Sequence, residues 1–413
     1  MNYIVADNFI KLNIKWIVPF LVLPRIVLSV LDIPFGPTIC SSIFIVVFLY
    51  LCKYGSFRKF VQMTPLLLWM LLIVYHHVNG YVKHVPLLRF PDYYHAIKMY
   101  CAVCIYSFLF CVDLKRTLKY LAISIFLWLI LAIAPTDYNG SGRLHGKGVI
   151  AVMLGKYSAV LAVCVIYYKS ITKSKVGNLL LCLIPPVVIV LLSQTRTAFG
   201  MILIQMIGYA YGVKMKGKIK VKTLVLTSFL FLAVYIGGGY LIDNTQIGGR
   251  LSEEKSLDYY TEKKIATGTF FDKIAGERLI YYVNGYVLFQ KHLLTGIGYN
   301  NYQNVTKGVY PMHVEYMVHL CEGGIIAFAL FCFFWFSIIK RIIRKHYDAS
   351  VLILLSSSIV MQLFSSMYSV SFDQEIPVII YGLLIAAGSK MLDSSEENFY
   401  SISTQRLISK RPM

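Results

Sequence analysis

Residues 322–340 read EGGIIAFALFCFFWFSIIK, an apolar run long enough to cross a bilayer. A polar segment precedes this run, and a basic cluster that begins at Lys340 follows it. The same alternation continues through the whole chain of 413 residues, of which 57% are hydrophobic and 15% are charged. Its mean hydropathy is +0.65. A soluble domain of this size could not bury so much apolar surface, so the sequence predicts an all-α polytopic integral membrane protein.

About twelve transmembrane helices are expected, because twelve apolar runs can cross a hydrocarbon core of about 30 Å, some with tilt or kinks. Pro19 and Pro24 should bend the first of them, and Pro185–Pro186 the seventh. The runs lie near residues 14–33, 37–52, 65–80, 95–112, 118–135, 148–168, 177–193, 196–213, 221–242, 322–340, 349–367 and 374–391.

The domain organisation follows from these runs. Residues 1–241 hold the first nine helices, and residues 242–321 form one long loop that contains short helices. Residues 322–391 hold the last three helices, and residues 392–413 form a polar tail. We expect one membrane domain overall, with the long loop as its working part, since long loops between spans usually carry function. The alternative is a tolerated surface insertion.

The net charge of +20 could suggest a nucleic-acid partner, but the distribution of the basic residues argues against one. They form short clusters between apolar runs, as in membrane proteins whose orientation is set by positive charge on the cytoplasmic side. With both termini inside, every predicted cytoplasmic link carries such a cluster, for example Lys11/Lys15 and Lys340/Arg341. The predicted topology is therefore N-in and C-in, with the long loop outside the cytoplasm.

Cysteine usage indicates no disulfide framework in the long loop, because none of the nine cysteines lies between Leu241 and Leu320. The pair Cys101-x-x-Cys104 sits one turn apart in a predicted membrane helix, where packing is the commoner role for cysteine than redox chemistry or metal binding.

A first candidate anion site is the hairpin between the seventh and eighth predicted spans, where Ser193, Thr195 and Thr197 bracket Arg196. Free backbone N–H groups, the helix dipole and a guanidinium would together favour a phosphate or a carboxylate. Helix capping with an arginine that snorkels to the headgroups explains the same residues equally well. Further arginines in regions expected outside include Arg143, Arg250 and Arg278.

The densest ionisable cluster of the long loop contains His313, Glu315, His319 and Glu322. In a helix, Glu315 and His319 share a face, as do His319 and Glu322. This spacing could bind a metal, but His313 would lie off that face, and we expect no metal or other cofactor. An imidazole could instead act as a general base, or simply hold a helix start as a structural histidine. The aromatic stretch Phe270–Phe289, which includes Tyr282, could anchor the loop at the membrane interface or form platforms for sugar rings.

The order of these motifs resembles the O-antigen polymerase and ligase superfamily. In that family, an arginine enters a membrane helix, and a long outer loop then carries an arginine, a Gly-x-Gly motif and a histidine before Glu-x-Gly. The corresponding pieces here are Ser193-Gln-Thr-Arg196-Thr-Ala198, Gly276-Glu-Arg278, Gly296-Ile-Gly298-Tyr-Asn-Asn-Tyr302 and His313-Val-Glu-Tyr316 followed by Glu322-Gly-Gly. The resemblance covers about residues 190–330. The chain departs from the family in having Val314 where asparagine commonly follows the loop histidine.

The resemblance implies a metal-independent, inverting glycosyl transfer on the outer face of the bacterial cytoplasmic membrane. The donor and the acceptor would be oligosaccharide repeat units carried on polyprenyl diphosphate. His313, Arg278 and Arg196 would be the catalytic residues: the histidine would activate the acceptor hydroxyl, and the arginines would hold the diphosphate. The substrate-binding residues would be Arg143, Arg250, Tyr282, Tyr302, Glu315, Tyr316, His319 and Glu322. Expected partners are the lipid bilayer and, in the same pathway, a chain-length regulator and a flippase.

The sequence thus predicts a polysaccharide polymerase of the Wzy type, for a capsular or other surface polysaccharide, with three alternatives. A ligase that transfers finished glycan to lipid A-core or to a protein has the same expected site. A flippase of the lipid-linked oligosaccharide is favoured by Arg25 and Lys156 within the predicted spans, but such transporters often show internal repeats, and none is visible here. A non-catalytic assembly partner would have no need for Arg196, Arg278 and His313 together.

Overall fold

The structure is a computed structural model that describes residues 2–24, 36–86, 90–133, 144, 151–172, 174, 176–193, 195–214, 279–306, 312–345, 347–367 and 375–389. The described elements are helices, which confirms the all-α expectation. In chain order they are α1 (Asn2–Val22), α3 (Gly36–Leu51), α4 (Gly55–Val61), α5 (Thr64–Val82), α6 (Phe90–Val112), α7 (Leu114–Ile133), α8 (Ala151–Ile171), α9 (Val176–Leu192), α10 (Arg196–Tyr209), η1 (Ala210–Lys214), α14 (Leu279–Lys291), α15 (Tyr302–Thr306), α16 (Glu315–Met317), η4 (Val318–Glu322), α17 (Gly324–Arg344), α18 (Ala349–Ser366) and α19 (Glu375–Ala387).

Six of the described helices are long and apolar enough to cross a membrane: α5, α6, α7, α8, α17 and α18. Shorter apolar helices occupy the predicted spans at α3, α9, α10 and α19. The first predicted span, at 14–33, overlaps α1, which begins at Asn2, ends at Val22 and contains Pro19; residues 25–33 of that span lie outside the described residues. The predicted span at 221–242 lies outside the described residues. The count of twelve and the N-in orientation therefore stay predictions.

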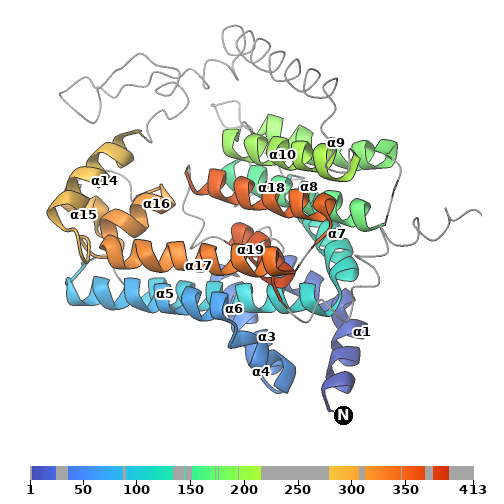
Figure 1. Cartoon of the computed structure of the whole chain (residues 1–413), viewed down its shortest axis with the longest axis horizontal. Coiled ribbons are helices and arrows are strands. Elements are labelled where there is room, and N and C mark those ends of the chain that lie inside the picture. Colours follow the sequence, from blue (N-terminus) through green and yellow to red (C-terminus); the bar gives the residue numbers. More distant parts are fainter. Residues whose placement is uncertain are drawn as a thin grey trace, which may run out of the picture.

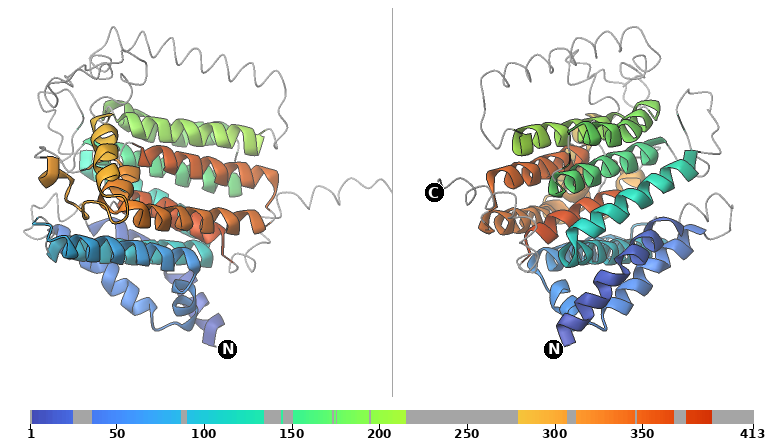
Figure 2. Two further views of the ribbon diagram at one scale, coloured as in Figure 1. Left: turned by 60° about the vertical axis from the view of Figure 1, so that its left-hand side comes forward. Right: turned by 90° about the vertical axis from the view of Figure 1, so that its right-hand side faces the viewer.

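Helices from the two ends of the chain pack against one another. In Figures 1 and 2 the long helices lie side by side, from α9 and α10 through α8 and α18 to α17 and then α5. The contacts pair α6 with α19, α10 with α18 and α5 with α17. Glycines permit these close approaches, since a Cβ at Gly382 would meet Tyr106 and one at Gly200 would meet Phe364. The second half of the chain is therefore packed against helices of the first half.

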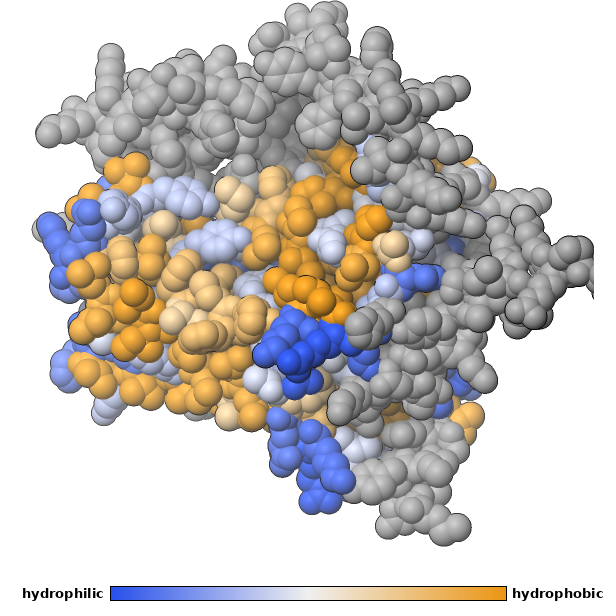
Figure 3. All heavy atoms as spheres, viewed as in Figure 1, coloured by the Kyte–Doolittle hydropathy of each residue, from blue (hydrophilic) through white to orange (hydrophobic). Residues whose placement is uncertain are grey.

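The surface shows the polarity expected of a protein that faces lipid. Apolar side chains cover much of the face seen in Figure 3, and α5 and α17 expose Leu71, Val74, Phe333 and Phe336. Polar side chains are instead found inside, among them Gln205 on α10. A bilayer would cover this apolar belt, so the surface supports the assignment to a membrane.

The short helix α4, which the hydropathy pattern does not predict, lies between α3 and α5 and buries two aromatic side chains. Phe57 and Phe60 pack on Phe108 of α6, with ring centroids 5.0 and 5.6 Å apart. The predicted cytoplasmic link between the second and third spans is therefore partly packed into the bundle.

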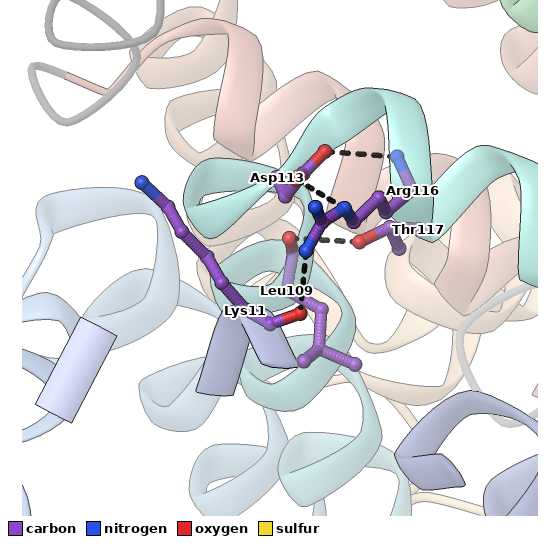
Figure 4. Close-up of polar contacts among 5 residues, drawn as sticks. All are labelled: Lys11, Leu109, Asp113, Arg116 and Thr117. Atoms are coloured by element: carbon purple, nitrogen blue, oxygen red, sulfur yellow. Dashed lines mark hydrogen bonds and ion pairs between the residues drawn. The ribbon is translucent and has the colours of Figure 1, made fainter. Parts of the chain in front are cut away.

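Basic residues mark one end of the bundle. At the turn between α6 and α7, the Arg116 side chain donates to the Lys11 carbonyl oxygen of α1 over 3.1 Å and pairs with Asp113 over 3.4 Å (Figure 4). Arg341, near the end of α17, donates to Thr64 Oγ1 at the start of α5 over 3.0 Å. Three of the predicted cytoplasmic clusters thus meet at one end. We call it the basic end, and the opposite end the loop end.

Candidate functional site

The loop after α14 lies alongside η4 at the loop end of the bundle. The Ile297 N–H donates to the Cys321 carbonyl over 3.0 Å, and the Gly298 N–H donates to the Glu322 carbonyl over 2.9 Å. The Gly-x-Gly motif and the Glu-Gly-Gly motif are therefore hydrogen-bonded to each other through their backbones, although more than 20 residues separate them.

This contact requires glycine at three positions. Gly296, Gly298 and Gly324 have φ angles of +67°, +99° and +69°, a region that other residues rarely adopt. A Cβ at Gly296 would lie 2.5 Å from the carbonyl oxygens of Cys321 and Glu322, and one at Gly324 would lie 2.3 Å from the Leu294 carbonyl oxygen. Glycine is therefore needed at positions 296 and 324 because the loop after α14 and the segment around η4 approach each other too closely to leave room for a Cβ.

The Glu322 side chain faces inward and holds the same loop. Its two carboxylate oxygens accept the N–H groups of Asn300, over 3.0 Å, and Tyr302, over 3.1 Å. Only 2% of the residue is exposed. Tyr302 itself is buried, and burial raises the pKa of its hydroxyl to about 12. Glu322 and Tyr302 were predicted to bind substrate, but in the structure both are buried and stabilise the conformation of the loop.

Helix α5 braces η4 from the other side through polar side chains. The Asn79 amide donates to the Thr295 carbonyl over 2.7 Å and to the Glu322 carbonyl over 3.1 Å. The Tyr75 hydroxyl donates to the Gly323 carbonyl over 2.9 Å. His76 Nε2 lies 2.9 Å from His319 Nδ1, and both rings are fully buried.

The sequence interpretation missed this role of α5. It predicted no role for Tyr75, His76 or Asn79 at the site. The usable signal was the density of polar side chains within the apolar run 65–80, because such groups are costly in a membrane and usually have a partner.

His319 lies just before α17 and is enclosed on its second side by an aromatic ring. Its ring stacks on Phe331 at a centroid distance of 4.3 Å. Burial lowers the pKa of His319 to about 3, so the imidazole is neutral at pH 7. A neutral ring fits the contact with His76, because one of the two facing nitrogens must accept a hydrogen bond.

We expect acidification to destabilise the fold through His319. The unfolded chain takes up a proton near pH 6.5 that the folded ring does not accept until about pH 3. The stability contributed by neutral His319 is therefore present above pH 6.5 and is lost as the pH falls, by roughly 2 kcal/mol at pH 5. Melting temperatures of the purified protein from pH 7 to pH 5 should fall more steeply for the wild type than for His319→Asn. The exposed His292 offers a matched control, since His292→Asn should keep the wild-type slope. Equal slopes for all three proteins would contradict the prediction.

The segment that follows His313 is anchored to the end of α18. Glu315 is fully buried and accepts hydrogen bonds from Ser366 Oγ and, over 3.4 Å, from the Tyr381 hydroxyl. The Tyr316 hydroxyl donates to the Leu363 carbonyl over 2.8 Å. The Tyr282 hydroxyl of α14 donates to the Met367 carbonyl over 2.9 Å. Glu315, Tyr316 and Tyr282 therefore each connect the loop to α18 or its end.

His313 is the exposed residue of this segment. Its neighbours Met312 and Val314 are buried, with 4% and 0% of their surface exposed. The ring of Tyr281 on α14 stands edge-on to the imidazole at a centroid distance of 5.7 Å, and Tyr281 also packs on Tyr302. The exposed imidazole of His313 therefore lies between two buried residues and beside the Tyr281 ring.

Arg196 is the first residue of α10, as the sequence predicts. The preceding Thr195 is extended and buried, and its hydroxyl lies 3.0 Å from that of Ser193. A Cβ at Gly155 of α8 would meet the Thr195 side chain at 2.5 Å, so α8 packs tightly on this helix start. Arg143, Arg250 and Arg278 lie outside the described residues.

The helical spacing predicts a shared face for Glu315, His319 and Glu322. In the structure their side chains contact different groups: Glu315 contacts Ser366 and Tyr381, His319 contacts His76, and Glu322 accepts the N–H groups of Asn300 and Tyr302. The segment changes from α-helix to π-helix at Val318, and each of its side chains has its own surroundings. Among the described residues, no three His, Cys, Asp or Glu side chains lie close enough together to hold a metal ion. The reactive group that this site offers is the exposed imidazole of His313, which belongs to a segment held by buried, hydrogen-bonded polar residues.

The all-helical bundle and its apolar belt are those of a polytopic membrane protein, and the loop after α14 forms a candidate site at one end of it. The sequence model of the family described as O-antigen ligase matches residues 179–332, from α9 into α17. This match confirms the resemblance to the O-antigen polymerase and ligase superfamily, and it contains the Arg196, Gly296 and His313 motifs. Over this region the chain is therefore similar to proteins of the O-antigen ligase family. No curated protein matches the chain.

Proposed function

We propose that this protein is a Wzy-type polysaccharide polymerase that joins polyprenyl-diphosphate-linked repeat units on the outer face of the cytoplasmic membrane. The observation that carries the proposal is the display of His313, exposed between buried neighbours within the family-matched region. Glycosyl transfer requires a base that can reach the acceptor hydroxyl, and an accessible imidazole has a pKa range suited to that role.

The position of the site supports an extracytoplasmic reaction. Lys11, Arg116 and Arg341 gather at the basic end, whereas His313 lies at the loop end. Positive charge marks the cytoplasmic side of membrane proteins, so the loop end would face outwards. Lipid-linked repeat units presented on the outer leaflet would then meet the site directly.

In the proposed reaction, the acceptor hydroxyl attacks the anomeric carbon of the donor sugar and gives its proton to His313. A new glycosidic bond forms with inversion as the bond to the diphosphate oxygen breaks, and the polyprenyl diphosphate leaves with the electron pair. No metal is required in this scheme. Arg196 at the start of α10, together with Arg278, would stabilise the negative charge that grows on the leaving group.

The residues near His313 take different roles in this proposal. Tyr281 on α14, which the sequence analysis did not assign to the site, provides an aromatic face beside His313 on which a sugar ring can pack. Glu322, His319 and Tyr302 are buried in the loop support and would act by positioning rather than by touching the glycan. Arg143 and Arg250 remain candidates for holding the anionic donor.

A ligase is the second candidate, and the description of the matching family favours it. The same base and arginines would serve, but the acceptor would be lipid A-core or a protein rather than a second repeat unit. The structure of the described residues is compatible with either acceptor, so the product decides between the two.

We expect a strain without this gene to make surface glycan of a single repeat unit, and the intact gene to restore a ladder of longer chains. The measurement is electrophoresis of surface glycan on a gel that resolves single repeats. Long glycan that persists on its lipid carrier would identify a ligase instead. Repeat units trapped on the cytoplasmic side would contradict both transferase proposals and favour a flippase.

A further inference from the structure

A buried carboxylate lies two residues after His313. Glu315 is the first residue of α16 and is fully buried. Ser366 Oγ, in the last turn of α18, donates to one of its oxygens, and the Tyr381 hydroxyl of α19 donates to the other over 3.4 Å. A carboxylate away from water is costly without such donors, so the start of α16 is tied to these two helices.

The Ser366 hydroxyl also has an alternative acceptor within its own helix. Its oxygen also lies 3.1 Å from the Gln362 carbonyl of its own helix, a partner that membrane serines commonly use. A single hydroxyl proton serves one acceptor best, and a carboxylate is a stronger acceptor than a neutral carbonyl. The contact between helices should therefore be preferred.

Two neutral contacts reinforce the same anchor. The Tyr316 hydroxyl donates to the Leu363 carbonyl of α18 over 2.8 Å, and the Tyr282 hydroxyl donates over 2.9 Å to the carbonyl of Met367, directly after α18. The segment that displays His313 is thus fixed to α18 on one side, while Tyr281 of α14 touches the imidazole on the other. A shift at the start of α16 would move His313 away from Tyr281.

We propose that Ser366 and Tyr381 are positioning residues that fix the imidazole of His313 through Glu315. Both residues lie outside the region that matches the family. The catalytic part of this inference rests on the proposed function, whereas the anchoring of His313 can be measured without it.

The test uses the full-length protein in lipid nanodiscs and the variants Ser366→Ala and Tyr381→Phe, singly and combined. Matched controls are Ser337→Ala, whose hydroxyl bonds only within α17 at 2.8 Å, and Tyr347→Phe, whose hydroxyl donates to Ala387 near the basic end. The first readout is the rate at which diethyl pyrocarbonate modifies His313, measured by mass spectrometry relative to the exposed His292. The second is the split between kcat and KM for a lipid-linked oligosaccharide.

The combined variant should modify His313 about threefold faster relative to His292, because a released segment samples open states more often. Its kcat should fall by about tenfold or more with little change in KM, since a displaced base still permits binding. Ser366→Thr, which keeps the hydroxyl, should restore both values, and the two controls should match the wild type. A merely structural role would lower the melting temperature without this pattern.

Unchanged His313 reactivity in a combined variant that remains folded would overturn the proposal. Where that variant does not accumulate, the single variants and Glu315→Gln carry the same comparison. Faster His313 modification in a protein whose His313→Ala variant keeps full activity would support the anchor and overturn the proposed function.

Discussion

Replacing His313 with alanine should lower the rate of glycan transfer by about 10²–10⁴-fold, the range typical for loss of a general base. The acceptor hydroxyl would then lose its proton to water in the transition state. The melting temperature should hardly change, because His313 is exposed and surface substitutions usually change stability by less than about 0.5 kcal/mol. The measurement is the time course of glycan elongation in membranes supplied with lipid-linked repeat units.

His292→Ala provides the matched control, since His292 is also exposed and lies directly after α14. This variant should keep wild-type activity at equal amounts of protein in the membrane. Full-length glycan from His313→Ala at the wild-type rate would remove the histidine from the mechanism. A loss of activity in both variants would point instead to a general sensitivity of the loop.

The largest loss of stability is expected from Gly296→Ala. Alanine at a φ of +67° costs about 1–2 kcal/mol, and its Cβ would also approach two carbonyl oxygens at 2.5 Å. The loop would have to move away from η4, weakening the bonds to Cys321 and Glu322. We expect a total cost of at least about 3 kcal/mol, since buried hydrogen-bonding groups would lose partners. Thermal unfolding in detergent, followed by tryptophan fluorescence, measures the effect.

Gly177→Ala tests whether glycine replacement alone accounts for such a loss. Gly177 lies near the start of α9, and nothing is within 4 Å of the Cβ that alanine would add. This variant should keep the wild-type melting temperature or raise it, because alanine favours a helix by about 0.8–1.0 kcal/mol over glycine. A similar melting temperature for Gly296→Ala and the wild type would contradict the prediction, because it would show that the loop can move to accommodate the alanine without loss of stability.

Hydropathy located most of the bundle because long apolar runs are its strongest local signal. The predicted runs at 65–80, 95–112, 118–135 and 349–367 each coincide with a described helix that can cross a membrane. The start of α1 at Asn2 was not predicted, since its first turns are too polar to register as a span. Which helices are neighbours was not predictable either, because the pairing of α6 with α19 depends on matching surfaces far apart in the chain.

The order of motifs indicated the region that the family model matches, but the spacing of the residues did not show which way their side chains point. Helical periodicity placed Glu315, His319 and Glu322 on one face, whereas the π-helical turn at Val318–Glu322 changes that register. A π-helical turn inside a helical segment has no clear sequence signature and is common at functional sites. The sequence also could not show that Glu322 is buried. Its carboxylate accepts the backbone N–H groups of Asn300 and Tyr302, which are distant in the chain and become neighbours only in the folded structure.

The hydrogen bonds from α5 to the segment around η4 have a consequence for recombination between related proteins. Tyr75, His76 and Asn79 hold η4 and the glycine loop, yet they precede the family-matched stretch 179–332 by about a hundred residues. A chimaera that joins the first half of one relative to the second half of another would separate these partners and leave His319 facing a foreign helix. A chimaera should therefore fold only if residues 75–79 come from the same relative as its second half. The part of the chain that must be exchanged together is larger than the region that carries the recognisable motifs.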